Sequence, residues 1–375
     1  MASIDSFSFD ADELHIHWSD QRESRLAGIW LRDHCQGSEC RDAHSGQRLM
    51  NISDVPMDIA IDKVVQQPDS LIIDFSPEGH SSEFSNEWLL RNCYCLNRQY
   101  DDRSEAGKQL WRADSFEQGL PRFDYQQFCQ RPASKLAALK SVKDSGFAIL
   151  EAVPCESAQV LKVIEEFGFV RETNYGPLFE VRSIVDANNL AFTNLGLGCH
   201  LDNPYRDPVP GLQLLHCLAS STSGGESILQ DGFMAASILR EENAQHFALL
   251  SQQWINFHFE DQQTDLQARV PFIEVNDLGQ VIKIRFNNRS IDTIKLPAER
   301  IKPFYDAYRH YAGILEREEL QLHFKLFPGE LMLFDNTRIL HARKPYSAAG
   351  TRHLQGAYSD LDGLYSRLNK LEKSA

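Results

Sequence analysis

The stretch HLDNPYRDPVPGLQLLHC occupies positions 200–217 and combines potential metal ligands with the start of an apolar, strand-like run. Residues two apart on an extended chain project to the same side of it. His200 and Asp202 can therefore offer an imidazole nitrogen and a carboxylate oxygen to one metal ion. An HxD pattern alone is a weak signal, so the assignment depends on finding a third ligand.

His341 is the best third ligand in the chain. It follows the strand-like run ELMLFDN at 330–336, 139 residues after Asp202, and would complete a facial triad with three open positions. Arg352 follows eleven residues later. Its planar guanidinium could bind a carboxylate through two parallel hydrogen bonds. This spacing favours a metal centre that also binds a small carboxylic acid.

A second pattern, His258-Phe-Glu260, is formally acceptable as the start of a triad. Its possible partners are His310 and His323, and neither is followed by an arginine at comparable spacing. We therefore rank this pattern below the one that begins at His200.

The overall charge excludes several kinds of partner. The 375 residues include 38 basic and 53 acidic side chains, which gives 38 − 53 = −15. Such a chain repels nucleic-acid backbones and anionic lipid, so we expect neither partner. No run of 18 apolar residues and no secretory signal are present, and the eight cysteines are expected in a reducing, cytoplasmic setting.

The periodicity of apolar residues predicts two domains of an α+β protein. Strands are expected near 14–18, 70–75, 146–153, 211–219, 226–233, 281–288 and 330–336, and helices near 156–167, 234–250 and 300–316. Separated strands with helices around them favour an antiparallel sandwich or barrel. The polar stretch 96–125 is the expected boundary, with a small domain over 1–105 and a larger one over 120–375.

Several longer motifs extend this interpretation. They are WLRDHCQGSEC (30–40), PEGHSSEF (77–84), NYGPLFEV (174–181), DANNLAFT (186–193), the 200–217 stretch, FDNTRILHARKPY (334–346) and RHLQGAYSD (352–360). Together they resemble the γ-butyrobetaine hydroxylase family of iron(II)/2-oxoglutarate dioxygenases over nearly the whole chain. The resemblance implies His200, Asp202 and His341 as iron ligands and Arg352 as the 2-oxoglutarate clamp. It further implies O2 as co-substrate, a homodimer, and a double-stranded β-helix (jelly roll) beside a small, mainly-β N-terminal domain.

The resemblance also implies a substrate with a trimethylammonium group, held in an aromatic cage. The matching positions are Tyr175, Phe179, Phe192 and Tyr358. Any one of these residues alone would be better interpreted as core packing. At the other end of the substrate, the family's asparagines correspond to Asn189 and Asn288.

Arg289 decides between the possible anionic groups. The segment reads Phe286-Asn287-Asn288-Arg289, and the family members compared carry an uncharged residue at this last position. A guanidinium suits a phosphonate better than a carboxylate, unless Arg289 points to solvent or pairs with Asp292. We therefore expect hydroxylation of 2-(trimethylamino)ethylphosphonate at C1, ahead of γ-butyrobetaine at C3. Trimethyllysine is less suitable because its amino acid head would need a different pocket.

A catalytically silent jelly-roll protein that only binds a ligand is the alternative from another class. The intact triad and Arg352 count against it.

The N-terminal module resembles the family's zinc domain only in part. Cys35, Cys40 and His80 match three of the four zinc ligands, but Gly37 stands at the position of the fourth. Three ligands do not close a tetrahedral structural site. The remaining ligand could come from His34, His44, Cys93 or Cys95, or zinc could be absent.

Overall fold

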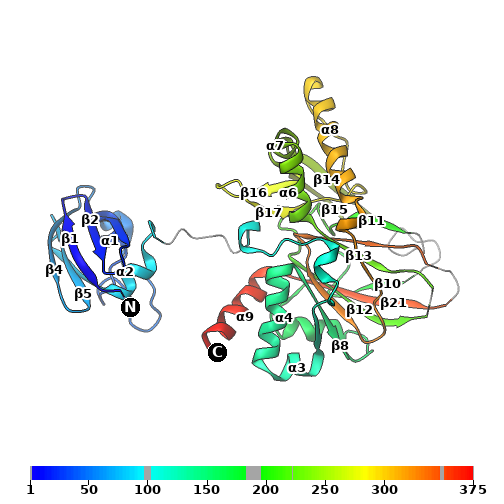
Figure 1. Cartoon of the computed structure of the whole chain (residues 1–375), viewed down its shortest axis with the longest axis horizontal. Coiled ribbons are helices and arrows are strands. Elements are labelled where there is room, and N and C mark those ends of the chain that lie inside the picture. Colours follow the sequence, from blue (N-terminus) through cyan, green and yellow to red (C-terminus); the bar gives the residue numbers. More distant parts are fainter. Residues whose placement is uncertain (1, 97–102, 183–195, 222, 347–349, 375) are drawn as a thin grey trace. The chain divides into compact units, whose positions relative to one another are not determined.

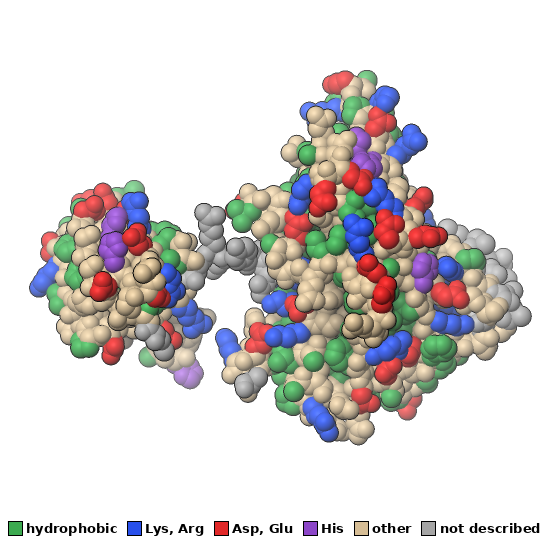
Figure 2. All heavy atoms as spheres, viewed as in Figure 1, with side chains coloured by type: hydrophobic (Ala, Val, Ile, Leu, Met, Phe, Trp, Pro, Cys, Tyr) green, Lys and Arg blue, Asp and Glu red, His purple; other side chains and the backbone are tan. Residues whose placement is uncertain are grey.

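The computed structural model describes residues 2–96, 103–182, 196–221, 223–346 and 350–374. The chain divides into two compact units, residues 1–100 and 101–375, which are described separately. Within the described ranges, no helix is both long enough and apolar enough to cross a membrane. On the face seen in Figure 2, acidic and basic side chains are interspersed over the larger unit, so the net negative charge forms no single acidic field there.

Two three-stranded antiparallel sheets form the N-terminal unit (Figure 1). Their strands are β1 (Ile4–Phe9), β2 (Glu13–Trp18), β3 (Glu23–Ala27), β4 (Ala60–Gln66), β5 (Ser70–Ser76) and β6 (His80–Ser85). Helices α1 (Gly28–Asp33) and α2 (Asn86–Asn92) complete it. The alternation along β2 buries Leu14, Ile16 and Trp18 in the core of this unit, as the sequence predicts.

The larger unit is a jelly roll built on two sheets. The seven-stranded sheet has the order β10-β21-β12-β19-β8-β7, with β9 also paired to β21. Its strands are β7 (Arg122–Asp124), β8 (Phe147–Glu151), β9 (Val170–Arg171), β10 (Phe179–Val181), β12 (Leu212–Ser220), β19 (Leu331–Asp335) and β21 (Arg352–Ser359). The four-stranded sheet, β11-β20-β13-β18, consists of β11 (Leu197–His200), β13 (Ser227–Asp231), β18 (Leu322–Phe324) and β20 (Ile339–Arg343).

Helices cover the outside of these sheets. One core cluster joins the seven-stranded sheet to α3 (Tyr125–Gln130), α4 (Pro132–Ser145), α5 (Gln159–Glu165) and α9 (Leu361–Ser374). A second cluster joins α6 (Gly232–Glu242), α7 (Ala244–Gln252) and α8 (Ala298–Leu315) to two hairpins, β14 (Ile255–Glu260) with β15 (Asp265–Val270) and β16 (Ile273–Val275) with β17 (Val281–Ile284). Figure 1 shows α4 and α9 packed together beside β8 and β12.

Two expected elements differ from the structure. The helix expected over 234–250 is two helices, because Asn243 ends α6 and its side chain accepts hydrogen bonds from the backbone N–H groups of Gln245 and His246 at the start of α7. The strand expected over 281–288 ends at Ile284. Beyond it, the Arg285 N–H still donates to the Phe272 carbonyl, but the next carbonyl, that of Phe286, accepts from the Leu201 N–H beside the metal ligands instead of from the hairpin.

Candidate iron and substrate site

Two histidines from neighbouring strands form the centre of the site. His200 ends β11, His341 lies on β20, and the two residues are direct cross-strand partners. Their ring centroids are 4.2 Å apart. With Asp202 they offer three ligand atoms that all lie within 4.8 Å of one another. The sheet therefore brings together the three residues predicted as iron ligands.

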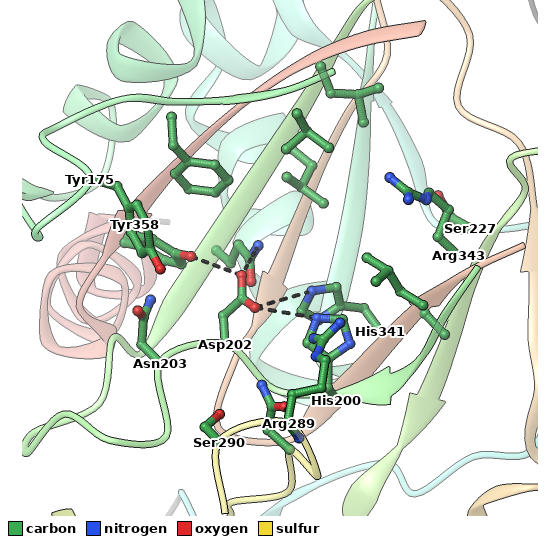
Figure 3. A pocket seen from close by; sticks show the side chains of 18 of the residues that line it. Tyr175, His200, Asp202, Asn203, Ser227, Arg289, Ser290, His341, Arg343 and Tyr358 are labelled. Carbon is green, nitrogen blue, oxygen red and sulfur yellow. Dashed lines mark hydrogen bonds and ion pairs between the residues drawn. The ribbon is translucent and has the colours of Figure 1, made fainter. Parts of the chain in front are cut away.

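Hydrogen bonds orient the carboxylate of Asp202. Its Oδ2 accepts from Gln213 Nε2 at 2.8 Å and from the Tyr358 hydroxyl at 2.9 Å. Its Oδ1 lies 3.4 Å from Nε2 of His200 and 3.9 Å from Nε2 of His341 (Figure 3). Because Oδ2 is already occupied twice, Oδ1 is the oxygen that faces a metal ion.

The protonation states also suit metal binding. Nδ1 of His200 lies 2.8 Å from the Gly198 carbonyl, and donation to that oxygen leaves the Nε2 lone pair for the metal. Burial, reinforced by His200, lowers the pKa of His341 to about 3, so its ring is neutral. Burial acts to raise the pKa of Asp202, but its neighbours His200 and His341 and the hydrogen bond from the Tyr358 hydroxyl together hold it below its ordinary value. Two imidazoles and one carboxylate form the ligand set of non-haem iron(II) oxygenases.

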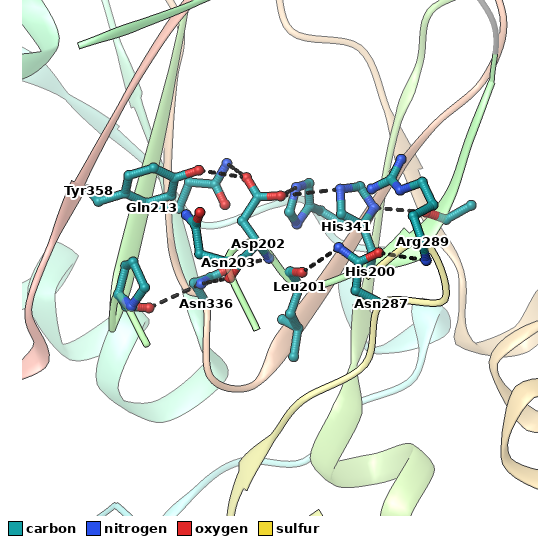
Figure 4. A network of polar contacts seen from close by, with 12 residues as sticks. His200, Leu201, Asp202, Asn203, Gln213, Asn287, Arg289, Asn336, His341 and Tyr358 are labelled. Atoms are coloured by element: carbon teal, nitrogen blue, oxygen red, sulfur yellow. Dashed lines mark hydrogen bonds and ion pairs between the residues drawn. The ribbon is translucent and has the colours of Figure 1, made fainter. Parts of the chain in front are cut away.

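The backbone that carries these ligands is held from two sides (Figure 4). The Leu201 N–H donates to the Phe286 carbonyl at 2.8 Å, and the Leu201 carbonyl accepts from Asn287 Nδ2 at 3.1 Å. The Asp202 N–H donates to Asn336 Oδ1 at 2.9 Å, and the Asp202 carbonyl accepts from Asn336 Nδ2 at 3.0 Å. Sequence reasoning gave no role to Asn336. Its only signal was an amide directly after a strongly apolar strand.

The ligands open into a cavity of about 380 Å³. Tyr175, Phe179 and Tyr358 line it, and the rings of Phe179 and Tyr358 stack with centroids 5.0 Å apart. Phe192 and Asn189, the other two residues expected at the substrate, lie outside the described ranges. The cavity thus has an aromatic end, built from three of the four predicted cage residues.

Two further aromatic residues, which the sequence did not single out, line the same cavity. Tyr205 stacks on Phe259 with ring centroids 5.0 Å apart. The Tyr205 hydroxyl lies 3.3 Å from that of Tyr175 and donates to Asn203 Oδ1 at 3.0 Å. Tyr205 follows Asp202 by three residues, and this proximity to a predicted ligand was the available signal.

The expected anion-binding segment lies at another part of the wall. Asn287, Arg289 and Ser290 line the cavity, whereas Asn288 is exposed and is not among the lining residues. The Asn287 side chain accepts from the Arg289 backbone N–H at 3.1 Å. Figure 3 draws Arg289 beside His200, on the opposite side of Asp202 from Tyr175 and Tyr358. Arg289 itself is solvent-exposed at the cavity wall.

Arg352 lines the cavity at the start of β21. Its Nη1 is buried and has no hydrogen-bond partner, and burial lowers its pKa. A buried guanidinium donor of this kind suits an anionic ligand, so Arg352 fits the distal carboxylate of 2-oxoglutarate. Arg343 also lines the cavity, and burial together with Arg352 lowers its pKa to about 10.

The lower-ranked pattern forms no metal cluster in the described part of the chain. His258 bonds to Asp265 at 2.9 Å rather than to a second histidine. Of the residues the structure describes, only one other group of three could hold a metal ion, namely Cys35, Cys40 and His80. His80 Nε2 lies 3.3 Å from the Cys35 sulfur and 3.6 Å from the Cys40 sulfur.

The fold and the ligand set define a non-haem iron, 2-oxoglutarate-dependent dioxygenase. Residues 106–358 match the model of the taurine catabolism dioxygenase TauD, TfdA family, and residues 6–90 match the γ-butyrobetaine hydroxylase-like N-terminal model. The chain belongs to this TauD/TfdA family, in its γ-butyrobetaine hydroxylase-like branch.

Curated relatives align with nearly the whole length of this chain. It is 33% identical to the γ-butyrobetaine dioxygenase of Homo sapiens, over 96% of this chain and 94% of that one. It is also 33% identical to the γ-butyrobetaine dioxygenase of Pseudomonas sp. (strain AK-1), and that alignment covers 100% of this chain and 96% of the relative. The chain is 30% identical to the trimethyllysine dioxygenase of Meyerozyma guilliermondii, and that alignment covers 97% of this chain and 94% of the relative. A solved asparagine oxygenase aligns with 62% of this chain and 81% of its own, at 16% identity and a TM-score of 0.49.

Proposed function

We propose that this dioxygenase hydroxylates 2-(trimethylamino)ethylphosphonate at C1. The observation that carries the proposal is the polarity of the cavity: an aromatic end at Tyr175, Phe179 and Tyr358 and a cationic wall at Arg289, with Asp202 and the histidines between them. Aromatic faces attract a quaternary ammonium, which cannot donate hydrogen bonds. A guanidinium suits a phosphonate, which offers three oxygens and more negative charge than a carboxylate.

The position of attack follows from this orientation. A trimethylammonium group in the cage presents the second carbon from nitrogen to the metal ligands, which is C1 of the phosphonate. The carbon beside the nitrogen is less reactive, because the positive charge disfavours removal of its hydrogen. Iron(II) and 2-oxoglutarate, when bound, supply O2 activation: one oxygen atom enters the substrate C–H bond as hydroxyl and the other enters succinate, with release of CO2.

Hydroxylation of γ-butyrobetaine at C3 is the second candidate, and the names of the relatives favour it. The same cage would serve, and a carboxylate would replace the phosphonate. Trimethyllysine, the substrate named for another relative, is less suitable because its amino acid head would need a different pocket for both its carboxylate and its ammonium.

The experiment compares succinate formation, coupled to product, with the two substrates. We expect the phosphonate to give the higher kcat/KM. We also expect Arg289→Met to lower kcat/KM about 10-fold or more for the phosphonate, and less for γ-butyrobetaine. Faster coupled turnover of γ-butyrobetaine by the wild type would overturn the proposal. Equal losses in the variant would remove Arg289 from the substrate site.

Whether the protein is catalytic at all is tested separately. Anaerobic addition of iron(II) and 2-oxoglutarate should give a weak visible metal-to-ligand charge-transfer band. A folded, iron-replete protein without that band would support the silent binding protein instead.

We further propose that the N-terminal unit binds one zinc ion through Cys35, Cys40 and His80. The distances from His80 Nε2 to the two sulfurs suit three ligands of a tetrahedral ion with Zn–S bonds near 2.3 Å and Zn–N bonds near 2.0 Å, and the fourth position would be taken by a water molecule. Metal analysis after dialysis should find one zinc per chain, and Cys40→Ser should lose it. Retention of zinc by that variant would mean that the ion is held elsewhere.

A further inference from the structure

The hairpin of β14 and β15 is joined to the segment that carries Arg289. Phe257 of β14 forms an antiparallel bridge with Ile291. The His258 N–H donates to the Ser290 carbonyl at 2.8 Å. Because neighbouring positions of an antiparallel pair run in opposite directions along the chain, the bridge places His258 directly opposite Ser290.

The side chains of His258 and Ser290 lie on the same face of this pairing. Residues directly opposite each other have Cβ atoms about 4.5–5.5 Å apart and project to one side. Both residues line the cavity. Ser290 follows Arg289 in the chain, and Figure 3 draws the two next to each other at the cavity wall. An imidazole, a hydroxyl and a guanidinium therefore border the same part of the cavity.

One carboxylate orients the ring of His258. Its Nε2 lies 2.9 Å from Oδ1 of Asp265, which is not among the lining residues. When Nε2–H donates to that oxygen, Nδ1 is the ring nitrogen left for a ligand. The His258 side chain is 35% exposed, so solvent can protonate it. In the protonated ring both nitrogens are donors, and His258 can then donate to Asp265 and to a ligand oxygen at once.

The net charge of the His258–Asp265 pair depends on pH. Histidine changes its charge between about pH 5 and pH 8. With a neutral ring the pair carries one negative charge, which repels an anionic ligand. With a protonated ring the pair is neutral and offers a donor. Glu260 and Arg269 lie on the same face of the hairpin with opposite charges, and Arg289 lies on the adjoining segment.

We propose that His258 is a binding residue for the anionic group of the trimethylammonium substrate, at the wall that it forms with Arg289 and Ser290. This role rests on the proposed function for the presence of an anionic group, but not for the choice between a phosphonate and a carboxylate. The sequence ranked His258 only as the start of a second ligand pattern. Its pairing with the Arg289 segment gives it a different role.

The test measures binding rather than turnover. Calorimetry under anaerobic conditions, with iron(II) and 2-oxoglutarate present, gives the Kd of three ligands at pH 6 and pH 8. Two of them, 2-(trimethylamino)ethylphosphonate and γ-butyrobetaine, carry an anionic group. The third, choline, has the same trimethylammonium group and two-carbon chain as the phosphonate but ends in a hydroxyl. The Kd of choline divided by that of an anionic ligand measures the preference for the anion.

Three variants accompany the wild type. His258→Gln removes the charge of the ring, and His258→Lys keeps a cation at both pH values. His323→Gln is the matched control, because His323 is exposed and does not line the cavity. The carboxylate of γ-butyrobetaine stays ionised from pH 6 to pH 8, so a change in its preference ratio over this range comes from the protein.

We expect the ratio for γ-butyrobetaine to be about 3- to 10-fold higher at pH 6 than at pH 8 in the wild type. His258→Gln should lose this pH dependence and keep the low ratio at both pH values, because Asp265 then has no cationic partner. His258→Lys should keep the high ratio at both pH values. His323→Gln should behave as the wild type does.

A ratio that does not change with pH in the wild type would overturn the role of His258, and this measurement needs no variant to fold. Full pH dependence in His258→Gln would overturn it as well. Tighter binding of γ-butyrobetaine than of the phosphonate, together with the expected effects of the His258 variants, would instead count against the phosphonate as substrate and leave the role of His258 intact.

Discussion

His200 and His341 lie directly opposite each other on β11 and β20, although 141 residues of sequence separate them (341 − 200). Their rings approach to 4.2 Å between centroids, and Asp202 follows His200 by two residues. One register of the four-stranded sheet therefore assembles the whole metal-ligand set. A shift of that register by one residue would turn His341 to the other face of β20 and destroy the site.

Asn336 is expected to control iron affinity without contacting iron. Its amide bonds to the Asp202 N–H and carbonyl, and to the Pro210 carbonyl at 3.0 Å. Asn336→Ala leaves these buried groups without partners, so it should lower the free energy of unfolding by about 2–4 kcal/mol. It should also weaken iron(II) binding about 10- to 100-fold. Urea unfolding and anaerobic iron titration measure the two effects.

Asn92→Ala is the control for Asn336, because Asn92 is exposed and makes a single side-chain bond to the Trp88 carbonyl. It should change neither quantity appreciably. Normal iron affinity in a folded Asn336→Ala protein would show that the amide does not position Asp202.

Gly356 is expected to be essential for the aromatic end of the cavity. It pairs with Phe179 in the sheet, and a Cβ at this position would come within 2.2 Å of the Phe179 ring. Gly356→Ala should displace that ring, raise the KM of the trimethylammonium substrate several-fold and leave 2-oxoglutarate affinity unchanged. Steady-state kinetics and the charge-transfer titration separate these effects.

The control for Gly356 is Gly313→Ala in α8, where a Cβ would meet nothing within 4 Å. This variant should bind substrate normally and be slightly more stable, because alanine favours a helix. An unchanged KM in Gly356→Ala would argue against Phe179 as a substrate contact.

His216 is expected to make the protein acid-sensitive. It is fully buried on β12, and burial lowers its pKa to about 4, against about 6.5 in an unfolded chain. Protonation therefore favours the unfolded state, and the stability present above pH 6.5 is lost as the pH falls towards 4. The loss from this residue between pH 7 and pH 5 should be about 2 kcal/mol.

His216→Leu should remove that part of the pH dependence. The free energy of unfolding in urea is compared at pH 7 and pH 5 for both proteins, and the difference between them isolates His216 from His341, which is also held neutral by burial. Identical pH dependence in the two proteins would contradict the assignment.

The ion pair between Arg338 and Asp231 is expected to be essential for folding. Both side chains are fully buried, with Nη2 to Oδ2 at 2.7 Å and Nε to Oδ1 at 3.0 Å. Arg338→Met leaves a buried carboxylate without its partner and should cost about 3–5 kcal/mol. Arg22→Met, which breaks the exposed pair with Asp20, should cost less than about 1 kcal/mol. Similar losses of unfolding free energy in the two variants would mean that the buried pair stabilises the fold no more than an exposed pair does.

Local sequence patterns predicted much of this protein. The alternation in β2 and the apolar run of β19 predicted strands, and the spacing of His200 and Asp202 predicted two ligands on one side of the chain. The break at Asn243 and the end of β17 at Ile284 were not predicted. A capping side chain in one case, and the backbone bond between Leu201 and Phe286 in the other, override apolar periodicity.

The sequence by itself determined which chemical groups are available, because ligand type, charge and the two-residue period of a strand are local properties. Only the tertiary structure decided which groups meet. The register of β20 against β11 and β13 places His341 opposite His200 and Arg343 opposite Ser227. The position of Asn287 rather than Asn288 on the cavity wall was decided in the same way. These choices depend on backbone hydrogen bonds between segments far apart in the chain, which no local spacing encodes.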